Sequence, residues 1–219
     1  MKYGFFSDAH GDFSAVEDSI AALSDAEEIL FLGDCAGERD SEKCIMSIRE
    51  RSVTALTGNH DRWIFETKGL SRESLNYLET LPLSLEREGF LAIHSDYDEK
   101  GGEIFFQYVQ SSHECEKVFS RYSQHIIFMG HTHAACVNQL REGVLSYIPV
   151  RCDIALKIDD ESRYIINVGM ACDCAVFYDS KEKVIHFRFH RRNTIKKSSP
   201  ARCGLIHRLL NIIQRSETH

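Results

Sequence analysis

Five short polar clusters in the first 133 residues carry side chains that can bind metal ions. They are Asp8-Ala9-His10, Gly33-Asp34, Gly58-Asn59-His60-Asp61, His94 and Gly130-His131-Thr132-His133. Carboxylates, an amide oxygen and imidazoles together form a hard-to-borderline ligand set that suits Mn²⁺, iron or Zn²⁺. Each cluster alone is a weak signal, since a histidine after an apolar run is usually a core residue. All five in order, each directly after an apolar run, predict a metal site.

The apolar runs before these clusters are predicted to be β-strands. They cover residues 3–7, 29–32, 53–56, 90–93 and 125–129. The spacing of apolar residues over 13–23 predicts a helix, and a second, more polar helix carries Ile45 and Ile48. Strands that alternate with helices indicate βαβ units and a mainly parallel sheet. Ligands of open α/β sheets bind outside the carboxyl ends of the strands, so the five clusters should meet in one crevice.

The chain after residue 137 shows short strands joined by turns. The predicted strands cover 144–150, 154–158, 164–168, 175–178 and 184–189, which suggests a second, more antiparallel sheet. An amphipathic helix is predicted at 205–213, after a mobile loop at 193–202. We expect one domain over 1–219, with a motif-bearing βα part (1–135), a mainly β part (136–192) and a final loop and helix (193–219).

The composition is that of an ordinary globular protein, with 43% hydrophobic and 27% charged residues. No apolar run approaches the length that crosses a bilayer, and Asp8 comes too early for a secretory signal, so we expect a cytoplasmic protein without a membrane partner. The net charge of −7 argues against a general nucleic-acid binder. Residues 181–202 nevertheless hold eight Lys or Arg and one acid, Glu182. This stretch is either a solvated face or a region that attracts an anionic ligand.

The eight cysteines are scattered along the chain without a repeated spacing. A chain of this size needs no disulfide staples, so we expect reduced thiols in a reducing compartment. Cys172 and Cys174 form a CxC pair, but no second pair completes a four-cysteine zinc site. Both are predicted to be buried structural residues.

The ordered clusters resemble the motifs of the metallophosphoesterase, or calcineurin-like phosphoesterase, superfamily: DxH, GDxxG, GNHD, a single His and GHxH. The resemblance covers about residues 3–133 by motif. It implies an α/β fold with two mixed β-sheets flanked by helices, in α/β/β/α layers. It also implies two divalent metal ions, with manganese favoured and iron, zinc or nickel as alternatives. The implied ligands are Asp8, His10 and His133 for the first ion, Asn59, His94 and His131 for the second, and Asp34 as the bridge between them.

The same resemblance implies a reaction. A hydroxide held between the two ions would attack phosphorus in line with the leaving oxygen, and the ions would stabilise the charge that develops. His60 lies in the same motif as Asn59 and is expected to protonate the leaving alkoxide. Asp61 has two interpretations, a loop-capping carboxylate or a direct catalytic group.

Departures from the family pattern bear on the substrate. Asp12 stands where small relatives carry Asn, and the turn at 167–170 (Asn-Val-Gly-Met) lacks the usual Pro and Ser. Gly37 stands where protein Ser/Thr phosphatases carry an acid, and Arg39 lies one residue beyond their phosphate-binding Arg. The small phosphodiesterase-like branch is therefore favoured over a protein phosphatase.

Three residues, Arg39, Arg62 and Trp63, and the segment 97–122 are candidates for substrate contact. Arg39 and Arg62 could grip a phosphate, and Arg62 is as readily a surface ion-pair residue. Trp63 could stack on a nucleobase, although the apolar residues after it favour a place in the core. The segment between His94 and His131 has room for a small cap of one or two helices.

Two further function classes stay open. One is a non-catalytic scaffold of the same fold, which the complete ligand set disfavours. The other is a nuclease or nucleotide-pyrophosphate hydrolase. The basic 181–202 stretch favours this class, and the negative net charge of the whole chain disfavours it. The expected partner is a small phosphoester or nucleotide, with nucleic acid possible but not favoured. The sequence leaves the oligomeric state open.

Overall fold

The computed structural model describes residues 1–37, 39–63 and 69–190, and the predicted helix at 205–213 and loop at 193–202 lie outside them. Its first sheet begins with three parallel strands, β1 (Lys2–Phe6), β2 (Glu28–Phe31) and β3 (Thr54–Ala55). Two helices connect them, α1 (Phe13–Ala22) and α2 (Ser41–Glu50). Asp12 caps α1 by accepting a hydrogen bond from the backbone N–H of Ala15 at 3.1 Å. The βαβ units predicted from the apolar spacing are confirmed.

The second sheet has the strand order β10-β9-β12-β8-β5-β4. Its members are β4 (Ser84–Arg87), β5 (Phe90–Ile93), β8 (Ile126–Met129), β9 (Cys136–Arg141), β10 (Val144–Pro149) and β12 (Ser162–Asn167). The central strands β5, β8 and β12 run parallel, and the outer strands pair antiparallel. The carboxyl ends of β5 and β8, from which two of the polar clusters emerge, therefore lie at one edge of the sheet.

The C-terminal strands do not form a sheet of their own, so this prediction is wrong. β11 (Ile154–Lys157), β13 (Cys174–Asp179) and β14 (Val184–Phe189) join the first sheet, where β13 pairs antiparallel with β1. The first sheet is therefore mixed, and the prediction of a mainly parallel sheet is wrong, because these three strands pair antiparallel. β10 and β12 instead complete the second sheet. An apolar run predicts a buried strand, but it carries no information about which neighbour accepts its hydrogen bonds.

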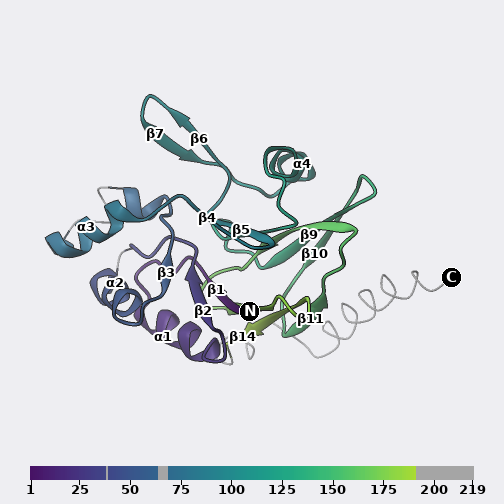
Figure 1. The fold of residues 1–219 in the computed structure, drawn as a ribbon. Helices are drawn as coiled ribbons and strands as arrows, with labels where there is room; N and C mark the ends of the chain where they lie inside the picture. The colour runs from purple at the N-terminus through teal and green to yellow at the C-terminus, as the bar shows by residue number, and fades with distance from the viewer. Residues whose placement is uncertain (38, 64–68, 191–219) are drawn as a thin grey trace.

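The main core lies between the two sheets and is rich in aromatic rings. Phe5 of the first sheet stacks on Phe128 of the second with ring centroids 3.9 Å apart, and Phe90 meets Phe5 edge-on at 5.4 Å. Helices α1 and α2 cover the outer face of the first sheet, and α4 (Ser112–Arg121) covers the outer face of the second. Figure 1 shows these helices at opposite ends of the stack. The α/β/β/α architecture implied by the family resemblance is confirmed.

A two-stranded hairpin rises from the body after His94 (Figure 1). Its strands are β6 (Tyr97–Lys100) and β7 (Glu103–Phe106). Arg121 of α4 fixes its base by donating to Asp96 Oδ1 at 2.5 Å, to the Tyr97 carbonyl at 2.6 Å and to Asp98 Oδ1 at 2.9 Å. The expected cap of one or two helices is therefore a hairpin followed by one helix, α4. A further helix, α3 (Arg72–Thr80), precedes β4.

The structure tests the prediction that all the cysteines are reduced. Cys152 is disulfide-bonded, so the prediction of eight reduced thiols is wrong there, because scattered positions in sequence can still meet in space. The thiols of Cys35, Cys44, Cys115, Cys136 and Cys174 are free and buried. Cys172 is half-buried, so the prediction of a buried residue is confirmed for Cys174 and wrong for Cys172.

In the described part of the basic stretch, Lys183 pairs with Asp160 and Arg188 with Asp25, which favours the solvated-face interpretation. No helix within 1–37, 39–63 or 69–190 is long and apolar enough to span a membrane.

Candidate metal centre

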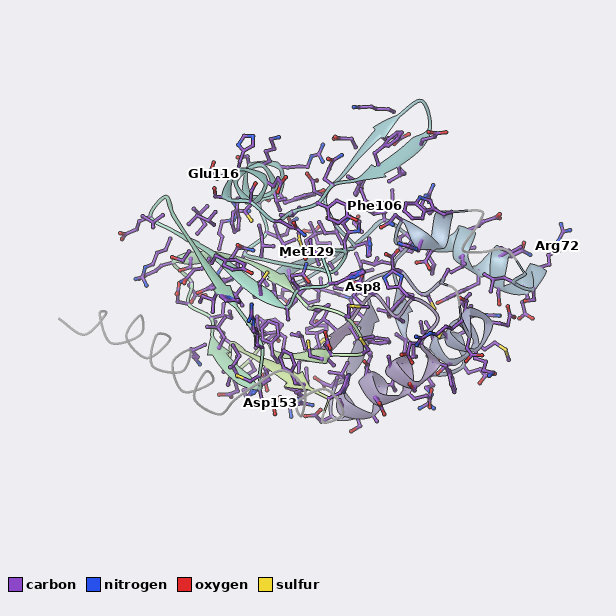
Figure 2. All side chains as sticks on the ribbon, turned by 180° about the vertical axis from the view of Figure 1, so that it is seen from behind. Asp8, Arg72, Phe106, Glu116, Met129 and Asp153 are labelled. Atoms are coloured by element: carbon purple, nitrogen blue, oxygen red, sulfur yellow. The ribbon has the colours of Figure 1, made fainter. Side chains whose placement is uncertain are left out.

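The structure brings the five polar clusters together at the carboxyl ends of β1, β2, β3, β5 and β8. One group has ligand atoms that all lie within 4.8 Å of one another, and it consists of Asp8, His10, Asp34 and His133. A second group within the same limit consists of Asp34, His94 and His131. Figure 2 shows Asp8 near the centre of the molecule, between the sheets and the hairpin that carries Phe106. The prediction that the five clusters meet in one place is confirmed.

The first group is compact and partly open to solvent. His10 Nε2 and His133 Nε2 lie 3.0 Å apart, and His133 Nε2 lies 3.4 Å from Asp8 Oδ1. His10 Nε2 lies 3.9 Å from both Asp8 Oδ1 and Asp34 Oδ2. Two imidazole nitrogens and two carboxylates thus face one common point, which suits a divalent cation.

The second group is buried. His94 Nε2 lies 3.3 Å from Asp34 Oδ2 and 3.2 Å from Asn59 Oδ1, while its Nδ1 lies 2.8 Å from the Leu32 carbonyl oxygen. A carbonyl only accepts, so Nδ1 carries a proton, and Nε2 is the nitrogen that faces Asp34. This is the usual way in which a ligating histidine is oriented by a partner behind it. His131 completes the group, with its ring 5.0 Å from that of His94.

Asp34 is the member that the two groups share. Its Oδ1 accepts a hydrogen bond from the His60 backbone N–H at 2.8 Å. Its Oδ2 and the Nε2 of His131 are buried and have no hydrogen-bond partner among the described residues. Buried polar atoms normally have partners, so these two point to a missing one. The residues present therefore fit divalent cations.

The backbone of the site is unusual, because five of the clustered side chains start from left-handed residues. These are Asp8 (φ 56°), His10 (46°), Asp34 (62°), His131 (66°) and His133 (60°). Each such non-glycine residue costs roughly 1 kcal/mol or more, which the surrounding packing must offset. Strain concentrated in this way is typical of functional sites.

Two glycines allow the loops to approach this closely. A Cβ on Gly58 would lie 2.1 Å from Asp34 Oδ1, and a Cβ on Gly130 would lie 2.1 Å from Ser7 Oγ and 2.5 Å from Asp8 Oδ2. The glycines before Asn59 and His131 are therefore explained by close packing against the carboxylates rather than by a positive φ.

The charges in the site are unevenly distributed. Burial alone would lower the pKa of His94, but the carboxylate of Asp34 outweighs it and raises this pKa to about 9. Burial would raise the pKa of the Asp34 carboxyl, but the neighbouring charge of His94 outweighs it and holds this pKa well below its usual range. Burial and the charge of His94 lower the pKa of His131 to about 4. The buried carboxylate of Asp34 is therefore stabilised by a positive charge beside it. A cation bound there would displace the proton from His94, since ligating imidazoles are neutral.

Asp61 is a loop cap. Its Oδ1 accepts from the backbone N–H groups of Cys35 and Ala36 at 2.8 Å, and its Oδ2 accepts from those of Asp34 at 2.8 Å and Gly58 at 2.9 Å. Burial, and then the charge of Asp34, raise its pKa. Of the two interpretations that the sequence left open, the contacts support the capping carboxylate, which ties the Asp34 loop to the Gly58 loop.

Replacing Asp61 with asparagine should destabilise the protein. The amide NH₂ would face two backbone N–H groups that now have an acceptor, and each unsatisfied donor costs about 1–3 kcal/mol. Urea unfolding should show a lower midpoint, and metal content should fall because the Asp34 loop is no longer fixed. Asp40→Asn is the matched control, since Asp40 is exposed and pairs with Lys43. An unfolding midpoint equal to that of the control would contradict the capping role.

Asn167 supports the loop of His131 and His133, a role that the sequence did not reveal. Its Nδ2 donates to the Gly130 carbonyl at 2.5 Å and to Thr132 Oγ1 at 2.9 Å, and its Oδ1 accepts from the Gly169 N–H at 3.0 Å. The only signal was the Asn at the start of the 167–170 turn. Asp8 also fixes this loop, because both of its carboxylate oxygens accept from the His131 N–H.

His60 and Trp63 lie beside the first group. The ring of His60 is 4.6 Å from that of His10 and 4.5 Å from that of Trp63. Trp63 is 50% exposed, so the expectation of a core position is wrong. Arg62 is exposed, and Arg39 is 73% exposed and lies 3.6 Å from Asp12 in an ion pair.

Phe106 at the end of the hairpin and Tyr108 just after it approach the second group. Both lie in the segment 97–122 that the sequence offered for substrate contact, although neither ring was singled out within it. The ring of Tyr108 lies 4.3 Å from that of His131, and the ring of Phe106 lies 5.3 Å from that of His94. Only the fold places these two rings beside the site, so no local signal identifies either of them.

Comparisons with known proteins identify the fold and the family of the chain. The structure is similar to a metallophosphoesterase from Sphaerobacter thermophilus, with a TM-score of 0.73 and 22% identity over 87% of this chain and 89% of that chain. It is also similar to an archaeal phosphodiesterase, with a TM-score of 0.50 and 18% identity over 87% of this chain and 100% of that chain. A search of curated proteins found no match. The calcineurin-like phosphoesterase superfamily domain matches residues 1–177, a span that contains all five clusters. The chain therefore belongs to the calcineurin-like phosphoesterase superfamily.

Proposed function

We propose that the protein is a dinuclear metal-dependent phosphoesterase that hydrolyses a P–O bond, with a phosphodiester as its substrate. The observation that carries this proposal is the position of Asp34 between two groups of ligand atoms. A single carboxylate shared by two such groups is what a bridging ligand requires. Asp8, His10, Asp34 and His133 would hold one ion, and Asp34, Asn59, His94 and His131 the other. Manganese is the favoured metal, since the carboxylate and amide oxygens suit it.

Two ions in this site would supply Lewis-acid activation of water and stabilise charge on the phosphoryl oxygens. The protein's own residues would do the rest. His94 and His131 hold their nitrogens in a buried setting that excludes bulk water. His60, half-buried and in edge contact with His10, would donate a proton to the leaving oxygen. Its backbone is fixed at the same time by the hydrogen bond from its N–H to Asp34.

A phosphodiester is favoured over a phosphoprotein by the surroundings of Gly37. A Cβ at this position would lie 2.3 Å from the His10 carbonyl oxygen, so no acidic side chain can stand there without moving the His10 loop. Protein phosphatases of the superfamily were expected to carry an acid at this position. The similarity to an archaeal phosphodiesterase is consistent with this choice. Arg39 and Arg62 are proposed phosphate contacts at the rim of the site, and the cytoplasmic location stays a prediction.

Hydrolysis of bis-p-nitrophenyl phosphate tests the proposal. The chain reconstituted with Mn²⁺ should release p-nitrophenolate, and a chelator should abolish this release because both ions are needed to bind the phosphoryl group. A parallel panel of phosphomonoesters, diesters and nucleotides would define the preference. A chain that holds two ions and hydrolyses none of these compounds would instead be a scaffold of the same fold.

A further inference from the structure

Two exposed aromatic side chains stand on either flank of the metal centre. Trp63 is 50% exposed and Tyr108 is 60% exposed. Trp63 contacts the first ligand group through His60 and His10, whereas Tyr108 contacts His131 of the second group. The two rings thus come from segments far apart in sequence and adjoin different halves of the same site.

The position of Trp63 is fixed by the turn that carries His60. This turn is a short 3₁₀ helix, η1 (His60–Arg62), directly after Asn59. The Trp63 backbone N–H donates to the His60 carbonyl at 3.3 Å, and the two rings lie 4.5 Å apart. The indole is therefore held against a site histidine while half of its surface stays open.

The position of Tyr108 is fixed on both sides along the chain. Before it, the Gln107 N–H donates to the Asp96 carbonyl at 2.8 Å, and Ser95 Oγ donates to the Gln107 carbonyl at 2.6 Å. After it, Val109 is buried. Arg121 holds Asp96 in turn. A firmly anchored segment that presents an exposed aromatic ring beside a site histidine is suited to contact with a ligand.

We infer that Trp63 and Tyr108 are stacking platforms for the two nucleobases of a dinucleoside phosphodiester, an inference that rests on the proposed function. A phosphodiester placed across both ion sites carries one ester group on each side of phosphorus. Exposed aromatic rings stack on bases of any sequence. His60, the proposed proton donor, contacts Trp63, so the leaving nucleoside would stack on Trp63 and the retained one on Tyr108. A dinucleoside monophosphate bears one negative charge and is little repelled by a chain of net charge −7, unlike a long nucleic acid.

Intrinsic fluorescence tests this inference, because Trp63 is the sole tryptophan of the chain. The metal-reconstituted full chain would be titrated with a phosphorothioate-linked diadenosine, which resists hydrolysis, and in parallel with dimethyl phosphate, which has no base. Tryptophan emission should change saturably with diadenosine and stay constant with dimethyl phosphate. Tyr108→Ala should weaken diadenosine binding about tenfold, the equivalent of losing one stacked base. Tyr147→Ala, which removes a 58% exposed ring on β10, should leave binding unchanged.

The outcomes separate this inference from the proposed function. Diadenosine that binds in calorimetry without changing the emission, or that binds equally well to Tyr108→Ala and wild type, would overturn the stacking. If the same preparation hydrolysed bis-p-nitrophenyl phosphate, the proposed function would stand without the stacking platforms. A saturable, Tyr108-dependent emission change in a chain without hydrolysis would instead support the platforms and remove the enzymatic proposal.

Discussion

Replacing Asp34 with asparagine should lower the bound metal from two ions per chain to one or fewer. An amide has a single ligating oxygen and no charge, so it cannot serve both ligand groups that share Asp34. Hydrolysis of bis-p-nitrophenyl phosphate should fall by roughly 10³-fold, the upper end of the loss caused by removing one stabilising group. Metal analysis after reconstitution with excess Mn²⁺, together with initial rates, measures both effects.

A suitable control for this substitution is Asp160→Asn. Asp160 is exposed and pairs only on the surface with Lys183, so the control should bind two ions and keep its rate. A wild-type stoichiometry fixed at one ion that Asp34→Asn leaves unchanged would disprove the bridged pair. The site would then be mononuclear, and the ligand roles would have to be reassigned.

Replacing His60 with alanine should slow the reaction in a way that depends on the leaving group. For esters with poor leaving groups, the loss should be about 10²–10⁴-fold, the usual range for general acid–base catalysis. For p-nitrophenyl esters it should be much smaller, because p-nitrophenolate leaves without a proton. Metal content should stay near two ions, since His60 contacts Asp34 through its backbone N–H rather than as a ligand.

His113→Ala is the control here, because His113 is an exposed residue of α4 away from the site. An equal loss for both kinds of ester would mean that His60 positions the phosphate instead of donating a proton. Loss of metal along with activity would make His60 a ligand. Either result would replace the proposed role of His60 while leaving the family membership intact.

The metal cluster could be predicted because its signals are local. An apolar run that ends in a polar motif predicts both a buried strand and a side chain at its carboxyl end, as at Phe31 and Asp34. Sheet membership could not be predicted in this way, since β10 and β11 have similar apolar patterns and join different sheets. Strand pairing depends on contacts distant in sequence, which periodicity does not encode.

Some other structural features had a signal in the local sequence, and others had none. The β6–β7 hairpin had one, because Gly101-Gly102 between two short extended segments is a typical hairpin turn, and both residues have positive φ. The choice between the two interpretations of Asp61 had none, because the capping role depends on N–H groups from two separate loops. The exposure of Trp63 also had none, since residues next to it in sequence do not report what packs on it.

Each proposed ion would draw ligands from both sheets, and this makes metal affinity and tertiary stability one linked quantity. Asp8, His10, Asp34 and Asn59 extend from the first sheet, and His94, His131 and His133 from the second. Bound ions would cross-link the two layers at their shared edge. A substitution that loosens the packing between the sheets, such as one that creates a cavity among the stacked phenylalanines, would then also weaken metal binding. Conversely, free metal at a hundred times its dissociation constant would add about 2.7 kcal/mol per site to the free energy of unfolding.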